Sequence, residues 1–313
     1  MNTAASPAPV LSVAPVTLPV PGRPVDLEMK VSAPVDGSDL PIILLSHGQG
    51  FSTHLSSLHG YAPLADYWAA RGFAVVQPTH LSSMTLSGVL GPDVPGAPMH
   101  WRSRAKDMSE ILDRLDAIES SVPQLRGRLD HGKVSVVGHS MGGHTASLLL
   151  GAGIKDPESG ETLNLADPRI KAGILLAAPG RGGEALSEWA ADNFPFMAGV
   201  DFSTMATPTL VVVGDEDEST HLTVRGPSWH ADPYHLAPGP KSLLTLFGGQ
   251  HGLGGVSGYD VAETTDENPD RVSAVRKFGL AYLQSRFFGG SNWEAAGKEL
   301  AEAPRPLGRV ESK

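Results

Sequence analysis

The chain has 313 residues, of which 41% are hydrophobic and 19% charged, so it can bury the core of one large globular domain or two ordinary ones. Asp and Glu outnumber Lys and Arg by 34 to 24, and the formal net charge of −10 argues against nucleic-acid binding and against a basic helix on anionic lipid. No apolar stretch approaches the length of a membrane span, and the absence of cysteine excludes disulfides, thiolate nucleophiles and cysteine metal sites.

The chain begins with a proline-rich segment. Residues 1–22 carry no Lys or Arg ahead of an apolar core, so they do not resemble a secretory signal. We therefore expect a cytoplasmic protein with a flexible N-terminal arm at 1–10. A chain from which a signal had been trimmed would instead be secreted.

Strand patterns and helix patterns alternate along the rest of the chain. Alternating or continuous apolar runs predict strands at 11–20, 25–33, 41–46, 73–77, 134–137, 170–178, 207–213 and 242–247. Helical spacing of apolar residues predicts helices at 61–68, 103–120, 146–150 and 270–287. The first two strands are expected to pair antiparallel. The alternation in the rest of the chain predicts an α/β fold with a mostly parallel central sheet and helices on both faces.

Two segments lack a regular pattern. Residues 81–99 form a long apolar loop rich in Gly and Pro, and residues 181–205 combine irregular helical character with several aromatic residues. We expect both to contribute to a small cap of loops and helices over the functional site, with burial in the core as the alternative. One domain is expected over 11–290, followed by a polar C-terminal tail at 291–313.

The most informative stretch is Gly138-His139-Ser140-Met141-Gly142, which lies between a predicted strand and a predicted helix. This is the context in which Gly-x-Ser-x-Gly forms a nucleophile elbow. The flanking glycines allow the backbone to turn sharply and neighbouring segments to approach closely. Ser140 is therefore predicted to be a nucleophile whose hydroxyl lies at the carboxyl edge of the sheet.

Acid and histidine candidates come after the serine in the order typical of α/β-hydrolases, and each comes after a predicted strand. His251 is predicted to be the general base that takes the proton of Ser140. Two carboxylates compete to orient this histidine. Asp217 lies three residues after Gly214, far enough to reach back, whereas Asp215 directly follows the glycine and could orient the turn instead. We favour Asp217 because of its reach.

Acyl transfer through a serine also needs hydrogen-bond donors for the oxyanion. The residue after the nucleophile, Met141, is predicted to supply one backbone N–H, and Gln49, in the loop after the third predicted strand, the other. Gly50 and Phe51 are alternative donors in that loop. These two residues and His139 are predicted to line the substrate pocket.

Other histidines and two arginines have ordinary structural interpretations. His139 and His144 are expected to pack around the elbow and its helix. The segment 230–235 contains two histidines and an aspartate, but a proline in its middle and the lack of a third ligand argue against a metal site. We therefore predict no metal and no organic cofactor. Arg102 and Arg104, at a helix start, are expected to be solvated or ion-paired.

Together, the segments GHSMGG, SHGQG, PTLVVVGDED and GGQHG resemble those of serine esterases of the α/β-hydrolase superfamily. SHGQG followed by YAPLADYWAARGFAVVQPTH is similar to dienelactone-hydrolase-like proteins, within the platelet-activating-factor acetylhydrolase and chlorophyllase-like branch. The likeness extends over residues 25–287. It implies Ser140 as nucleophile, Asp217 as acid, His251 as base, and Gln49 and Met141 as oxyanion donors.

Three departures bear on the substrate. Dienelactone hydrolases proper use a cysteine nucleophile, the chlorophyllase elbow usually differs after the serine, and cutinases have an aromatic residue where Gln49 stands. The sequence predicts a serine carboxylesterase that forms an acyl-enzyme with a neutral, fairly apolar ester of small to medium size. Two alternatives stay open: the same triad acting on a lactone, thioester, amide or polyester, and a binding protein without turnover. The oligomeric state is not predicted.

Overall fold

The structure is a computed structural model that describes residues 7–91, 94–258 and 261–313. Within these residues a nine-stranded sheet has the order β1-β2-β4-β3-β5-β8-β10-β11-β12. Its strands are β1 (Val10–Leu18), β2 (Leu27–Pro34), β3 (Leu40–Ser46), β4 (Ala74–Pro78), β5 (Leu129–His139), β8 (Ile170–Leu176), β10 (Thr209–Gly214), β11 (Lys241–Leu246) and β12 (Gly308–Ser312). The run from β4 to β11 is parallel, whereas β2 is antiparallel to β1 and β4, and β12 is antiparallel to β11. The predicted α/β fold with a mostly parallel sheet is thus confirmed.

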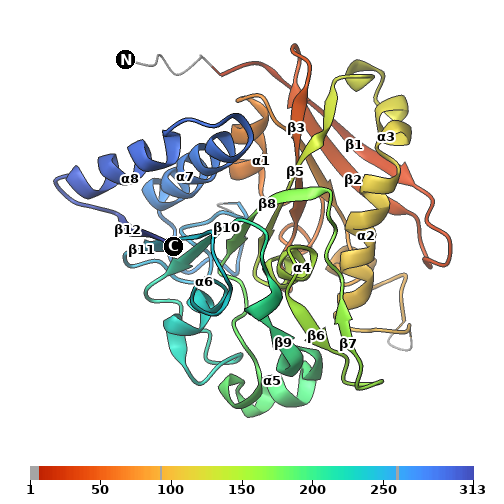
Figure 1. Cartoon of the computed structure of the whole chain (residues 1–313). Helices are drawn as coiled ribbons and strands as arrows, with labels where there is room; N and C mark the ends of the chain where they lie inside the picture. Colours follow the sequence, from red (N-terminus) through yellow and green to blue (C-terminus); the bar gives the residue numbers. More distant parts are fainter. Residues whose placement is uncertain (1–6, 92–93, 259–260) are drawn as a thin grey trace.

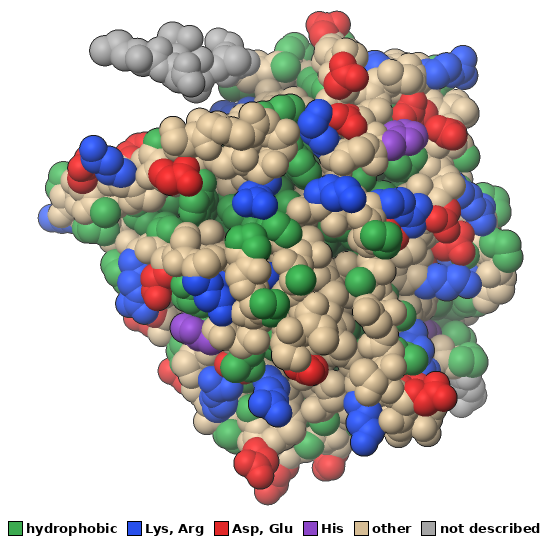
Figure 2. Space-filling model, viewed as in Figure 1, with side chains coloured by type: hydrophobic (Ala, Val, Ile, Leu, Met, Phe, Trp, Pro, Cys, Tyr) green, Lys and Arg blue, Asp and Glu red, His purple; other side chains and the backbone are tan. Residues whose placement is uncertain are grey.

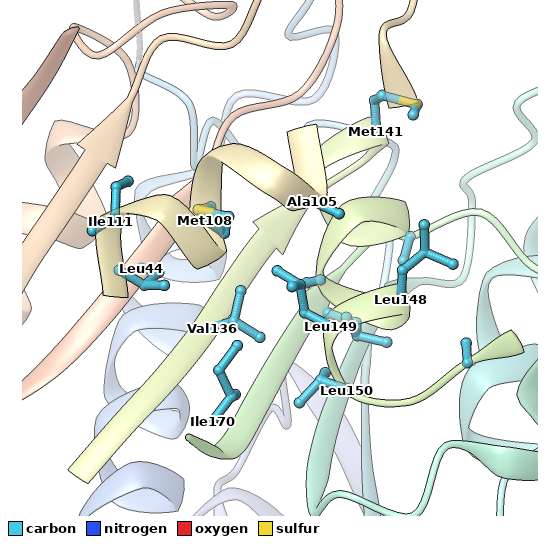
Figure 3. Close-up of a cluster of buried hydrophobic side chains, with 14 of the residues drawn as sticks. Leu44, Ala105, Met108, Ile111, Val136, Met141, Leu148, Leu149, Leu150 and Ile170 are labelled. Carbon is cyan, nitrogen blue, oxygen red and sulfur yellow. The ribbon is translucent and has the colours of Figure 1, made fainter. Parts of the chain in front are cut away.

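Helices cover both faces of the sheet (Figure 1). One face is covered by α1 (Ala62–Ala69), α7 (Pro269–Phe288) and α8 (Asn292–Glu302), and the other by α2 (Trp101–Asp113), α3 (Leu115–Ser121) and α4 (Met141–Leu149). Successive side chains of β3 point to opposite faces, so that Ile42 and Leu44 join one apolar cluster and Ile43 the other. Figure 3 shows part of the first cluster, to which Met108 of α2 and Val136 of β5 both belong.

A smaller group of elements lies at the lower end of the view in Figure 1. It comprises β6 (Gly153–Lys155), β7 (Thr162–Asn164), η3 (Gly183–Ala185), α5 (Glu188–Asn193), η4 (Pro195–Gly199), β9 (Val200–Asp201) and η5 (Phe202–Thr204), where η denotes a 3-10 helix. The three short strands form a second sheet in the order β7-β6-β9, which the sequence analysis did not predict. The remaining helical elements are η1 (Met84–Leu86), η2 (Pro123–Leu125), η6 (Gly226–Ala231) and α6 (Asp232–Leu236).

Three terminal or helical segments differ from expectation. The single helix predicted at 103–120 is two helices, α2 and α3, because the backbone leaves the helical region at Arg114. Residues 291–313, expected as a polar tail, form α8 and the edge strand β12. In α8, Trp293, Ala296 and Leu300 follow the i, i+3, i+7 spacing of a helix, and the sequence analysis did not use this pattern. Of the predicted arm, residues 1–6 lie outside the described residues, and Val10 already begins β1.

No helix in the described part of the chain combines the length and the apolar character needed to cross a membrane. On the face shown in Figure 2, basic and acidic side chains are interspersed.

Candidate active site

The candidate site lies where parallel strands end. The chain leaves β3 into the Gln49 loop, β5 into Ser140, β10 into the Asp217 loop and β11 into the His251 loop. Because the carboxyl ends of parallel strands meet at one edge of the sheet, residues far apart in sequence converge there.

Ser140 occupies a tight turn between β5 and α4. Its backbone angles, φ 54° and ψ −120°, lie in a region that few residues other than glycine adopt. Close packing explains the glycines on either side. A Cβ atom on Gly138 would lie 2.0 Å from the Gly142 carbonyl oxygen, and one on Gly142 would lie 2.1 Å from the Ser46 carbonyl oxygen. Larger residues at these two positions would therefore push the turn apart.

Ser140, His251 and Asp217 form a continuous hydrogen-bonded row. The Nε2 atom of His251 lies 2.8 Å from Oγ of Ser140, and its Nδ1 atom lies 2.8 Å from Oδ2 of Asp217. Asp217 is buried, whereas the His251 side chain is 32% exposed. Asp215, the competing carboxylate, instead accepts a hydrogen bond from the Gly248 N–H at 2.7 Å. The structure therefore gives Asp217, and not Asp215, the contact with the histidine.

Asp217 has two further partners that the sequence analysis did not identify. Ser219 Oγ donates to Oδ1 of Asp217 at 2.6 Å, and Nε2 of the buried His230 lies 3.2 Å from Oδ2. Burial alone would raise the pKa of the Asp217 carboxyl. The neighbouring His251, which is hydrogen-bonded to the carboxylate, and the nearby His230 outweigh burial and hold this pKa well below its usual range. Asp217 is therefore a carboxylate anion.

His251 is a stronger base than an isolated histidine. Burial lowers the pKa of its imidazole, but the adjacent Asp217 carboxylate and its hydrogen bond overcome this effect and raise the pKa above the ordinary 6.5. The Asp217 contact also favours a proton on Nδ1, which leaves the lone pair of Nε2 directed at the Ser140 hydroxyl. The row can thus withdraw a proton from the serine.

Asp217, His230 and His251 also bring potential metal-ligand atoms within 4.8 Å of one another. Asp217 and His251 are already hydrogen-bonded to each other, and Nδ1 of His230 lies 2.9 Å from the Ala178 carbonyl oxygen. Asp232, in the 230–235 segment considered above, instead forms an ion pair with Arg225 at 2.7 Å.

Gln49 and Met141 lie beside Ser140 in the wall of one cavity. Met141 is the first residue of α4, where a backbone N–H has no partner within the helix. Neither the Gln49 N–H nor the Met141 N–H donates a hydrogen bond to any residue that the structure describes. The Gln49 side chain is held separately, because its Nε2 donates to the Ser82 carbonyl oxygen at 2.8 Å. Both backbone donors are thus available to a ligand.

The cavity above Ser140 has a volume of about 750 Å³. The predicted pocket residues Gly50, Phe51 and His139 all line it. The two segments predicted as a cap contribute the apolar side chains of Met99, Trp189, Phe194 and Met197. Residues 218–222 and 262–265 also line the wall, and the sequence analysis did not identify them, because both are loops without apolar periodicity.

His139 connects three loops around the site. Its Nε2 atom lies 2.8 Å from the His251 carbonyl oxygen and its Nδ1 atom 3.0 Å from the Tyr61 hydroxyl, which accepts the Gly48 N–H at 2.8 Å. Burial, and secondarily the charge of His251, lowers the pKa of His139 to about 3, so the ring is neutral. Three hydrogen bonds therefore run in series. The Gly48 N–H donates to the Tyr61 hydroxyl, this hydroxyl donates to Nδ1 of His139, and the Nε2–H of His139 donates to the His251 carbonyl oxygen. His139 does more than pack beside the elbow.

Replacing Tyr61 with phenylalanine is expected to lower the free energy of unfolding by about 1–3 kcal/mol, because the Gly48 N–H and Nδ1 of His139 would be buried without a partner. Urea denaturation of the purified protein measures this change. Tyr67→Phe on the neighbouring helix is the matched control, since the Tyr67 hydroxyl has no hydrogen bond to a described residue. Equal stability of the two variants would show that the hydrogen bonds of the Tyr61 hydroxyl do not stabilise the fold.

The arginines divide between surface and interior. Arg102 forms ion pairs with Asp156 and, at 3.2 Å, with Glu158, as expected. Arg104 does not fit the prediction that it is solvated or ion-paired: its side chain is wholly buried, and no ion pair joins it to a described residue. His144 is buried and packs edge-on against Phe196, with 5.2 Å between ring centroids, in agreement with a packing role.

A family model described as "Alpha/beta hydrolase family" matches residues 42–254, more than half of the chain. The matched range begins in β3 and includes Ser140, Asp217 and His251. No curated protein sequence matches the chain. The match and the parallel sheet with helices on both faces agree, and such a family supports a hydrolytic activity. The chain belongs to the alpha/beta hydrolase family.

Proposed function

We propose that the protein is a serine hydrolase that cleaves carboxylic esters through an acyl-enzyme. The observation that carries this proposal is the row Ser140–His251–Asp217, with both hydrogen bonds at 2.8 Å. A neutral hydroxyl is a poor nucleophile, and a histidine within hydrogen-bond reach, itself oriented by a buried carboxylate, is the arrangement that activates it.

In the first half of the reaction, Ser140 Oγ attacks the ester carbonyl carbon while Nε2 of His251 takes the hydroxyl proton. Asp217 holds the Nδ1–H and stabilises the imidazolium. The backbone N–H groups of Gln49 and Met141 bind the oxyanion. The tetrahedral intermediate collapses when the bond to the alcohol oxygen breaks, and the alcohol leaves with the proton from Nε2.

In the second half, a water molecule replaces the alcohol. His251 takes one proton from this water, whose oxygen attacks the acyl carbon of the Ser140 ester. The second tetrahedral intermediate uses the same oxyanion donors and collapses to release the carboxylic acid, and Nε2 returns its proton to Ser140 Oγ. The cycle needs no cofactor.

The cavity favours a substrate with an apolar body. Phe51 and Trp189, which are 70% and 50% exposed, line the cavity together with buried Met197. A volume of about 750 Å³ accommodates a small to medium ester. Within the family we propose the dienelactone-hydrolase-like branch near the platelet-activating-factor acetylhydrolases and chlorophyllases, because of the segments SHGQG and YAPLADYWAARGFAVVQPTH.

Acidic side chains around the cavity predict discrimination against anionic esters. The lining contains Glu216, Asp217, Glu218 and Glu263 but no Lys or Arg among the described residues. We expect kcat/KM for mono-p-nitrophenyl adipate to be about tenfold below that for its methyl ester, because the free carboxylate is repelled. The ratio should shrink as salt screens the charges. An equal or higher kcat/KM for the anionic ester would contradict this charge preference.

The test of the proposed function combines covalent labelling with a substrate series. We expect a fluorophosphonate to label Ser140, located by mass spectrometry, and p-nitrophenyl esters to be hydrolysed with an optimum acyl length. Labelling without ester turnover would indicate that the row acts on a thioester, lactone, amide or polyester instead. Neither labelling nor turnover would contradict the proposal and favour a binding protein.

A further inference from the structure

Arg104 is a fully buried cation behind the candidate site. Its side chain has 0% relative exposure, and burial lowers the pKa of the guanidinium to about 9. The nearby carboxylate of Asp107 is already paired with Arg23 at 3.0 Å and hydrogen-bonded to His80 at 2.9 Å. Burial of a charge is costly unless polar groups compensate for the lost water. The oxygen atoms that accept hydrogen bonds from the Arg104 guanidinium compensate for this cost, and they show which segments the side chain holds in place.

Two of these oxygens belong to residues that position the Gln49 loop. The guanidinium Nη2 donates to the His47 carbonyl oxygen, two residues before Gln49, and Nη1 donates to Ser82 Oγ at 2.7 Å. The carbonyl of the same Ser82 accepts the hydrogen bond from the Gln49 side chain at 2.8 Å. Arg104 thus fixes the backbone that leads to Gln49 and also the residue that anchors the Gln49 side chain.

A third oxygen belongs to the helix that begins at the elbow. The Nε atom of Arg104 donates to Thr145 Oγ1 at 3.0 Å, and this hydroxyl donates in turn to the Met141 carbonyl oxygen at 3.1 Å. In Figure 3, the turn of α2 that contains Ala105, the residue after Arg104, lies beside α4. One planar guanidinium therefore bridges the two segments that carry Gln49 and Met141.

We propose that Arg104 is a positioning residue that sets the distance between the two oxyanion donors, the Gln49 N–H and the Met141 N–H. The proposal rests on the proposed function, since it takes these groups to be the donors. The planar guanidinium directs N–H groups from three nitrogen atoms, Nε, Nη1 and Nη2, at oxygens on separate segments, whereas the three N–H groups of lysine all diverge from one nitrogen atom on a flexible stem and cannot span the same positions. Loss of the fork would let the Gln49 loop move relative to the start of α4.

The test compares Arg104→Lys and Arg104→Gln with the wild type, and Arg102→Gln, a surface position on the same helix, is the matched control. The readouts are kcat and KM for a p-nitrophenyl ester, the inhibition constant of a trifluoromethyl ketone, the pH profile and the melting temperature. The ketone forms a hemiketal oxyanion on the serine, so its affinity reports the oxyanion donors directly.

We expect kcat to fall by about 10- to 100-fold in both Arg104 variants, because a displacement of about 1 Å can cost 100-fold in rate. KM should change by less than about twofold, since the substrate ground state does not use these donors fully. Affinity for the ketone should weaken by the same factor as kcat. The acid limb of the pH profile, which reports His251, should be unchanged, and Arg102→Gln should match the wild type.

Folded Arg104 variants with wild-type kcat and ketone affinity would overturn the proposal, as would a fall in kcat without a matching loss of ketone affinity. If the Arg104 variants do not fold, Ser82→Ala and Thr145→Val decide, because each removes one contact and keeps the buried charge. Each of these two should lower kcat and ketone affinity in parallel, and unchanged values in both would refute the role of Arg104. Absence of labelling and turnover in the wild type would instead overturn the proposed function itself, so the two failures are distinguishable.

Discussion

Replacing Ser140 with alanine is expected to lower kcat for a p-nitrophenyl ester by about a millionfold, the loss typical of a serine nucleophile that works as a unit with its histidine. Without Oγ no acyl-enzyme forms, and His251 has no hydroxyl to deprotonate. Substrate affinity should change little, because the cavity wall stays intact. Steady-state hydrolysis by carefully purified protein measures the effect, with the melting temperature as a check on folding.

Ser147→Ala provides the matched control for this experiment. Ser147 lies on the same helix, α4, and its Oγ donates to the Gly143 carbonyl oxygen at 2.8 Å, away from the cavity lining. We expect it to retain wild-type turnover. Turnover by Ser140→Ala within tenfold of the wild type would mean that another group attacks the ester.

Replacing Asp217 with asparagine is expected to lower kcat by about 10,000-fold, since the imidazole loses its orienting carboxylate and can adopt the wrong tautomer. The pH dependence gives a second readout. His251 must be neutral to accept the serine proton, so wild-type kcat/KM rises as pH rises through the pKa of His251. Because Asp217 raises that pKa, the wild-type midpoint should lie above 6.5, and in Asp217→Asn it should move to lower pH.

The control for this prediction separates the two carboxylates that the sequence left in competition. Asp215→Asn removes the acceptor of the Gly248 N–H and leaves the contact between Asp217 and His251 intact. We expect it to keep nearly wild-type kcat and an unshifted pH midpoint. A large loss in Asp215→Asn, together with an active Asp217→Asn, would reverse the assignment of the acid.

The parallel strands were predictable because burial on both faces makes them continuous apolar runs, as in Ile42–Leu45 and in the valines of β5. The turn at Ser140 was predictable because its close packing leaves no room for side chains at Gly138 and Gly142, so that the motif requires glycine there. The edge strand β12 was not, since its residues are mostly polar and the residues of β11 with which they pair lie 62 to 70 positions earlier in the sequence. A strand stabilised by pairing with a distant strand need not show any local pattern of apolar residues.

The candidate site shows the same division. Ser140, His251, Asp217, Gln49 and Met141 could be predicted as residues that follow strands, because parallel strands bring their carboxyl ends to one edge of the sheet. Tyr61, His139, Arg104 and His230 acquire their contacts only when separate elements of the fold meet, at sequence separations from 13 to 112 positions. A buried arginine and a surface arginine on one helix cannot be distinguished by their identity.

The amino-acid sequence by itself determined the α/β class, the elbow and the order of serine, acid and histidine, because these depend on local sterics and on the periodicity of apolar residues. The tertiary structure decided which carboxylate contacts His251, which loops enclose the cavity and which buried groups support the Gln49 loop. Such choices depend on hydrogen bonds in an interior of low dielectric constant, where a polar side chain is stable only when a distant segment supplies its partner.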